Sequence, residues 1–195
     1  MKKAPVWFAA ATLAAVGAMS IAGRSGAGDD KALANSIDKV AEALKKGDKE
    51  GAKKQAEAIG KKIEEVVEAM DLLKPRKKGG FGVGEKPGAI VPDGIEQMLI
   101  KIGRDAPAKG TLNKDADAYE QMGYRTAAIG LIAHAKTPPK DMGKKTRKDW
   151  MAWSNEMVDA SLQLAAAAKA KSPADVKSAA AKLNNNCNSC HTVFR

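Results

Sequence analysis

Apolar residues recur every three or four positions along most of this chain, and this spacing restricts the fold more than any other feature. In a helix such spacing gathers the side chains on one face, whereas a half-buried strand needs strict alternation. No strand-period segment of any length occurs in the 195 residues. The sequence therefore predicts an all-α, four-helix-bundle-like fold with an extra N-terminal helix and a loop rich in Gly and Pro.

Glycine and proline mark where the expected helices begin and end. Gly47-Asp48 separates the first two helices, and Lys74-Pro75 ends the second. Thr137-Pro138-Pro139 breaks a later helix, and Ser172-Pro173 has the residue types of a helix start. The predicted helices cover residues 33–44, 52–73, 95–102, 115–135, 150–167 and 173–194.

A basic segment over residues 74–92 interrupts this pattern and is predicted to be a loop or lid in which no helix persists. Its glycines at 80, 82 and 84 do not form a phosphate-binding turn. The spacing is wrong, no strand precedes them, and no Lys-Ser/Thr pair follows.

Composition agrees with closely packed helices. Hydrophobic residues make up 44% of the chain and aromatic residues only 4%, and much of the apolar content is alanine. A sandwich of strands would need more valine, tyrosine and phenylalanine.

The N-terminus has the pattern of an export signal. Lys2 and Lys3 precede an almost uncharged run over residues 5–22 that ends in small residues. Residues 1–22 are predicted to be a signal peptide, with retention as an uncleaved membrane anchor as the alternative. The functional domain is then 29–195, located in the periplasm.

The charge balance indicates the kind of partner. Loss of Lys2 and Lys3 with the signal lowers the net charge from +10 to +8. In a compartment without nucleic acid, a basic surface favours acidic protein partners or anionic membrane faces, although solvated lysine-rich helix faces have the same composition. The sequence leaves homodimer formation open.

The two cysteines of the chain form one motif, Cys187-Asn-Ser-Cys190-His191. Two thiols at this spacing can add to the vinyl groups of one haem, and the adjacent imidazole can bind its iron. Both cysteines continue an inward helical seam that ends at Phe194, which is therefore expected in the haem environment. A Cys187–Cys190 disulfide fits a helical turn poorly, and a zinc site lacks ligands, because His134 is the only other histidine.

The C-terminal stretch CNSCHTVFR, preceded by a helix that contains tryptophan, resembles the end of the cytochrome c prime family. The resemblance covers roughly the last 80 residues. It implies a four-helix bundle, thioethers at Cys187 and Cys190, His191 as the proximal iron ligand and Arg195 close to the proximal face. The extra N-terminal hairpin and the loop at 74–92 depart from the family pattern.

A sixth iron ligand would have to come from upstream, since only four residues follow His191 and none is methionine. Low-spin members of the resembled family use a methionine of the first bundle helix, which makes Met70, Met98 and Met122 candidates. Met70 is preferred, because it closes a regular inward seam just before its helix ends, and Met98 comes second. Core filling is the competing role for each methionine. His134 is expected to cap a helix end rather than bind iron.

The sequence thus predicts one covalent haem c and one-electron transfer. The alternative is a five-coordinate haem protein that binds NO or CO. No enzymatic activity is expected and no catalytic residue is assigned.

Overall fold

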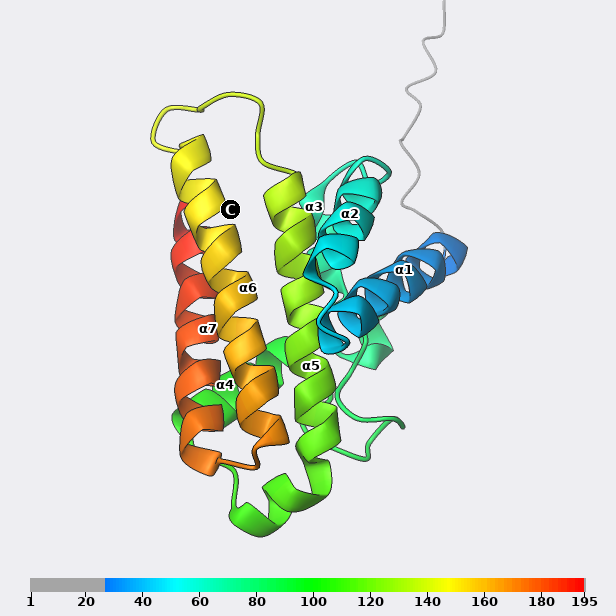
Figure 1. Cartoon of the computed structure of the whole chain (residues 1–195), viewed down its shortest axis with the longest axis vertical. Helices are drawn as coiled ribbons and strands as arrows, with labels where there is room; N and C mark the ends of the chain where they lie inside the picture. The colour runs from blue at the N-terminus through cyan, green and yellow to red at the C-terminus, as the bar shows by residue number, and fades with distance from the viewer. Residues whose placement is uncertain (1–26, 195) are drawn as a thin grey trace, which may run out of the picture.

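The structure is a computed structural model that describes residues 27–194 (Figure 1). The predicted signal peptide, residues 1–22, and Arg195 lie outside this range. Helices are the only regular elements named within this range, which confirms the all-α prediction. Its elements are α1 (Ala27–Lys45), α2 (Lys49–Gly60), α3 (Val66–Asp71), the 3-10 turn η1 (Arg76–Lys78), α4 (Ile95–Arg104), α5 (Lys109–Ala135), α6 (Arg147–Lys169) and α7 (Pro173–Phe194).

The C-terminal four helices form the bundle. α5 packs along α6, α6 along α7, and the short α4 lies against α7. Glycine allows the closest approach, because a Cβ on Gly123 would lie 2.7 Å from the carbonyl oxygen of Ser161 and 2.8 Å from the backbone nitrogen of Ala165. The sequence predicted each of these helices, although α5 begins at Lys109 rather than near residue 115.

The N-terminal hairpin of α1 and α2 packs against α5, and Figure 1 shows α1 crossing it. A bidentate ion pair fastens this crossing. The Arg125 guanidinium on α5 donates to the two carboxylate oxygens of Asp38 on α1 at 2.7 and 3.1 Å. The predicted extra helix at the N-terminus is therefore present as part of a hairpin that covers one side of the bundle.

The continuous helix expected over 52–73 is wrong: α2 ends at Gly60, and α3 starts only at Val66. The cause is a capping box, in which the Glu68 carboxylate accepts from the backbone N–H groups of Glu64 at 2.8 Å and Glu65 at 2.9 Å. These bonds satisfy donors that a new helix start leaves free. The apolar seam continues across the break because Ile63 is still buried.

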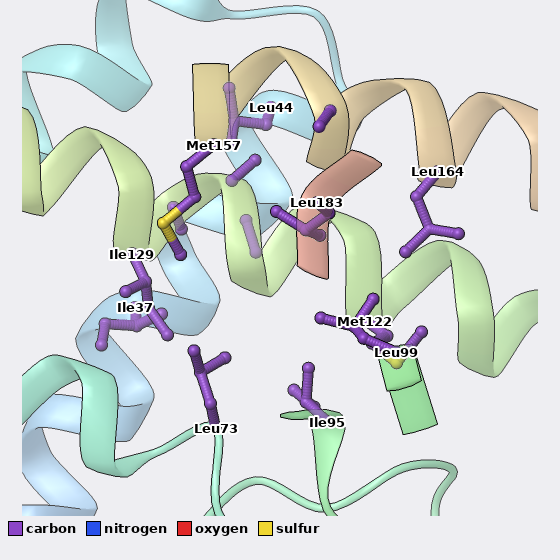
Figure 2. Packing of buried hydrophobic residues seen from close by; sticks show 14 of the residues in the cluster. Ile37, Leu44, Leu73, Ile95, Leu99, Met122, Ile129, Met157, Leu164 and Leu183 are labelled. Atoms are coloured by element: carbon purple, nitrogen blue, oxygen red, sulfur yellow. The ribbon is translucent and has the colours of Figure 1, made fainter. Parts of the chain in front are cut away.

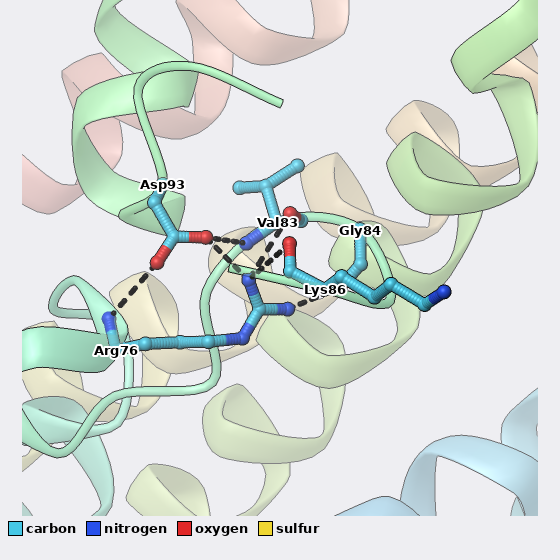
Figure 3. A network of polar contacts seen from close by, with 5 residues as sticks. All are labelled: Arg76, Val83, Gly84, Lys86 and Asp93. Carbon is cyan, nitrogen blue, oxygen red and sulfur yellow. Dashed lines mark hydrogen bonds and ion pairs between the residues drawn. The ribbon is translucent and has the colours of Figure 1, made fainter. Parts of the chain in front are cut away.

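The connection between α3 and α4 is a loop, as predicted, apart from the single 3-10 turn η1. Figure 3 shows how it folds around the Arg76 side chain. The guanidinium donates to the carbonyl oxygens of Val83 at 3.4 Å and Lys86 at 3.3 Å, to that of Gly84, and to the carboxylate of Asp93. The loop therefore has a defined shape with an arginine at its centre.

The core lies where helices of both halves meet. Figure 2 shows Met157 of α6, Ile129 of α5, Leu183 of α7 and Ile95 of α4 directed toward the same region as Leu73. All five side chains are buried. Apolar packing thus closes the interior at the level of Leu183, one helical turn before the first cysteine.

Candidate functional site

The cysteines lie on the inward seam of α7, as predicted. Pro173 begins this helix, and Val176, Ala180 and Leu183 are all fully buried. One turn later Cys187 is partly buried and packs against the core, and Cys190 is also partly buried. Burial therefore decreases along the seam toward the C-terminus.

Burial decreases along α7 because α4 covers only part of that helix. Glu96, in the first turn of α4, is close enough for its carboxylate to act on the Cys187 thiol. Further along α4, a Cβ on Gly103 would lie 2.9 Å from the backbone nitrogen of Ala181. Figure 1 shows α4 inclined across α7, with its last turn at Ala181, its first turn on the side of Cys187, and the last turns of α7 extending past it.

The His191 side chain is exposed, although the seam predicted it on the inward face with Cys187. Because α4 does not reach the last turns of α7, no residue of α4 covers the imidazole. The sequence pattern could not reveal this, since it fixes the position of a residue on its own helix and not the length of the neighbouring helix.

Both thiols are free and protonated at neutral pH. Burial, with a smaller contribution from the Glu96 carboxylate, raises the pKa of Cys187 to about 11, and burial also raises the pKa of Cys190. Cys187 and Cys190 do not form a disulfide with each other, so both sulfur atoms are available for covalent bonds to another group.

Asn186 ties α7 to α6 at the turn that carries the first cysteine. Its side chain is buried, and the amide nitrogen donates to the carbonyl oxygen of Trp153 at 3.2 Å and to the Glu156 carboxylate at 3.0 Å. Sequence reasoning missed this role. The available signal was a polar residue three positions after Leu183, at an inward position of the helix.

Aromatic packing fixes the end of α7. The Phe194 ring meets Trp150 edge-on at 4.9 Å between centroids and Trp153 at 5.7 Å. The Trp150 indole nitrogen also donates to the carbonyl oxygen of Ala133 on α5 at 2.7 Å. The start of α6 and the end of α5 therefore lie beside the cysteine motif. The two tryptophans of α6 hold the Phe194 ring in place there.

The candidate sixth ligands occupy different environments. Met98 is fully buried on α4, Met122 is almost as deeply buried on α5, and Met70 is half-buried on α3 against the core. The carbonyl oxygen of Leu73 accepts from the Glu96 N–H at 3.2 Å, which joins the segment after α3 to the first turn of α4.

The helix end at His134 is capped by other residues. The Thr137 hydroxyl donates to the His134 carbonyl oxygen at 2.6 Å, and the Lys136 N–H bonds to the carbonyl oxygens of Ile132 and Ala133. These bonds provide the capping that the sequence assigned to the His134 side chain.

The donor set of the motif fits a haem better than a bare metal ion. Within residues 27–194, no three His, Cys, Asp or Glu side chains are grouped so as to hold a metal. A porphyrin supplies four nitrogen ligands of its own, so that iron needs only an imidazole from the protein, while two neighbouring thiols can anchor the macrocycle. Cys187, Cys190 and His191 provide these three groups.

The family model described as Cytochrome C' matches residues 101–195, a region that starts within α4 and includes α5, α6 and α7. The match covers just under half of the 195 residues and agrees with the resemblance that the C-terminal motif predicted. No curated protein and no solved structure matched the chain.

A match to this family model indicates a c-type haem protein with covalently bound haem. No helix in the described range combines the length and apolar character needed to cross a membrane.

Proposed function

We propose that this protein is exported to the periplasm and carries out one-electron transfer through a single haem. One haem per chain is expected because the sequence has only two cysteines. The observation that carries the proposal is the position of both free thiols on the inward seam of α7, directly before His191. The bound haem would supply an iron that changes reversibly between the ferric and ferrous states.

The protein residues have separate tasks in this proposal. Cys187 and Cys190 would hold the haem by thioethers, and His191 would bind its iron. Asn186 and Phe194 hold the last turns of α7 against α6, so the attachment turn is rigid before any ligand is bound. Rigid positioning of this kind limits the rearrangement that accompanies electron transfer.

Met70 is the proposed sixth ligand. The Leu73 carbonyl adjoins the first turn of α4, and that turn adjoins Cys187. Met70 lies one helical turn before Leu73 and is only half-buried, which leaves its thioether accessible. Met98 is enclosed on α4, a helix packed against α7, and is better explained as core filling.

The ferric spin state tests this proposal. Protein made with a cytochrome c maturation system should retain its haem in acid-acetone and be low-spin, with a sulfur-to-iron charge-transfer band. Met70→Ala should convert it to high-spin and let the ferrous form bind CO. Met98→Ala, the matched control, should stay low-spin despite lower stability.

A wild-type protein that is high-spin in both oxidation states and binds CO and NO readily would contradict the proposed electron-transfer role. That result would favour the gas-binding alternative. Loss of low-spin character in Met98→Ala but not in Met70→Ala would instead move the ligand to α4.

A further inference from the structure

The connection between α5 and α6 concentrates positive charge at the haem-attachment end of the bundle. Residues 136–148 contain six Lys or Arg and one Asp. Figure 1 shows this connection at the same end as the C-terminus, and Trp150, in the first turn of α6, lies 4.9 Å from the Phe194 ring at the end of α7. A charged partner approaching the haem would therefore meet this segment.

The connection has a fixed shape. Met142 and Lys145 form two backbone hydrogen bonds of 3.0 and 3.1 Å across a tight turn at Gly143. The Asp141 carboxylate accepts from the Arg147 N–H at 2.6 Å, and the Thr146 hydroxyl caps α6. A docking surface of this kind loses little conformational entropy on binding.

The charges are available to a partner. Lys140, Lys144, Arg147 and Lys148 are exposed, and none of them takes part in the ion pairs found within residues 27–194. The one acidic side chain of the connection, Asp141, is engaged by the backbone N–H of Arg147. With Asp149 in the first turn of α6 included, residues 136–149 have six basic and two acidic side chains, and the surface is net positive.

Two further observations separate this surface from ordinary solvated lysines. Arg147 and Lys148 occupy the first turn of α6, where the helix dipole disfavours positive charge, so helix stability does not explain them. Met142 is 54% exposed among the charges, and Met151 is 38% exposed on the second turn of α6. An apolar residue with basic neighbours is typical of a protein interface with a charged rim.

We propose that the α5–α6 connection and the start of α6 form the docking surface for an acidic redox protein. This partner would exchange electrons with the haem held by the cysteine motif of α7. This inference rests on the proposed electron-transfer function. Charge complementarity identifies the partner, and it would act mainly on the rate of association.

Stopped-flow reduction by a plant-type ferredoxin, a small acidic one-electron protein, tests the proposal on the full haem-loaded chain. At low salt, Lys144→Glu/Lys148→Glu should lower the second-order rate about tenfold or more, because steering charges chiefly set the association rate. The wild-type rate should also fall as ionic strength rises.

Lys53→Glu/Lys54→Glu is the matched control. It changes the net charge equally through exposed lysines of α2, a helix that packs against α1 and α5, and it should retain at least about a third of the wild-type rate. Excess dithionite should reduce all three proteins to the same final extent, which shows an intact haem in each.

Equal slowing by both double variants, or no slowing by either, would overturn the proposed surface. Loss of binding to phosphatidylglycerol vesicles in Lys144→Glu/Lys148→Glu, with an unchanged ferredoxin rate, would assign the surface to a membrane instead. Failure of the underlying function is recognised separately, by a high-spin spectrum with avid CO binding.

Discussion

Burial determines the reactivity of the two cysteines in the protein before haem is attached. A thiol must lose its proton to become a nucleophile, and the raised pKa of Cys187, about 11, keeps it protonated at neutral pH. The same burial links stability to pH. Because the folded pKa lies above the unfolded value, the stabilisation is complete below about pH 9 and is lost as pH rises through 11.

Alkylation of the haem-free protein measures this effect. When modification at Cys187 is followed separately by peptide mass spectrometry, iodoacetamide should react with it about a hundredfold more slowly at pH 8 than in urea, given its smaller thiolate fraction. The rate should increase up to about pH 11. Equal rates in buffer and in urea, with helical circular dichroism retained in buffer, would show that Cys187 is not buried.

The sequence correctly predicted which residues face inward where this depends only on their position along their own helix. The periodicity of α7 correctly placed Leu183, Cys187 and Cys190 on the inward face. It failed for His191 and for Asn186, because exposure of the first and hydrogen bonding of the second depend on neighbouring helices. Asn184, Asn185 and Asn186 are poor helix formers, and the two hydrogen bonds of Asn186 to α6 favour the helix at this point.

At the scale of elements, the closeness of α5 and α6 depends on small residues at their interface. The missing side chain of Gly123 lets the Ser161 and Ala165 backbone lie against α5, and Gly130 similarly faces Val158. Contact at this distance leaves no room for even one methyl group.

Gly123→Ala should therefore lower the free energy of unfolding by about 1–3 kcal/mol, despite the better helix propensity of alanine. Thermal unfolding followed by circular dichroism would show a midpoint lower by several degrees. The matched control is Gly110→Ala, on the same helix, where a Cβ would meet nothing within 4 Å. That control should be neutral or slightly stabilising, and an equal loss in both variants would refute the packing argument.

Element boundaries were less predictable than element existence. The apolar repeat runs through Ile63 without interruption, but the Glu65–Glu68 capping box starts a new helix there. Local side-chain hydrogen bonds at a helix end can therefore outweigh a continuous hydrophobic pattern.

On the scale of the whole molecule, Arg125 joins three parts of the chain. It extends from α5, pairs with Asp38 of α1, and lies 4.5 Å over the Phe81 ring of the loop between α3 and α4. Its side chain is 20% exposed, so solvent weakens these interactions only in part. The four bundle helices were predictable from their apolar seams, but this cross-link between distant segments was not, since no local pattern marks it.

Arg125→Lys should destabilise the protein by about 1–2 kcal/mol, because lysine lacks the bidentate fork and the flat face that stacks on an aromatic ring. Arg104→Lys is the control, since its pair with Asp105 is 77% and 69% exposed and should contribute less than about 0.5 kcal/mol. Urea unfolding of both variants gives the comparison. A loss for Arg125→Lys no larger than that for Arg104→Lys would contradict the cross-link.

The bond between the Glu96 N–H and the Leu73 carbonyl means that the loop built around Arg76 leaves and re-enters the helical body at nearly the same point. Because the two ends already meet, the intervening chain does not set the spacing between α3 and α4. The loop can therefore become longer or shorter without moving the helices. It is an insertion point at which the chain can gain new surface while the haem-binding bundle is preserved.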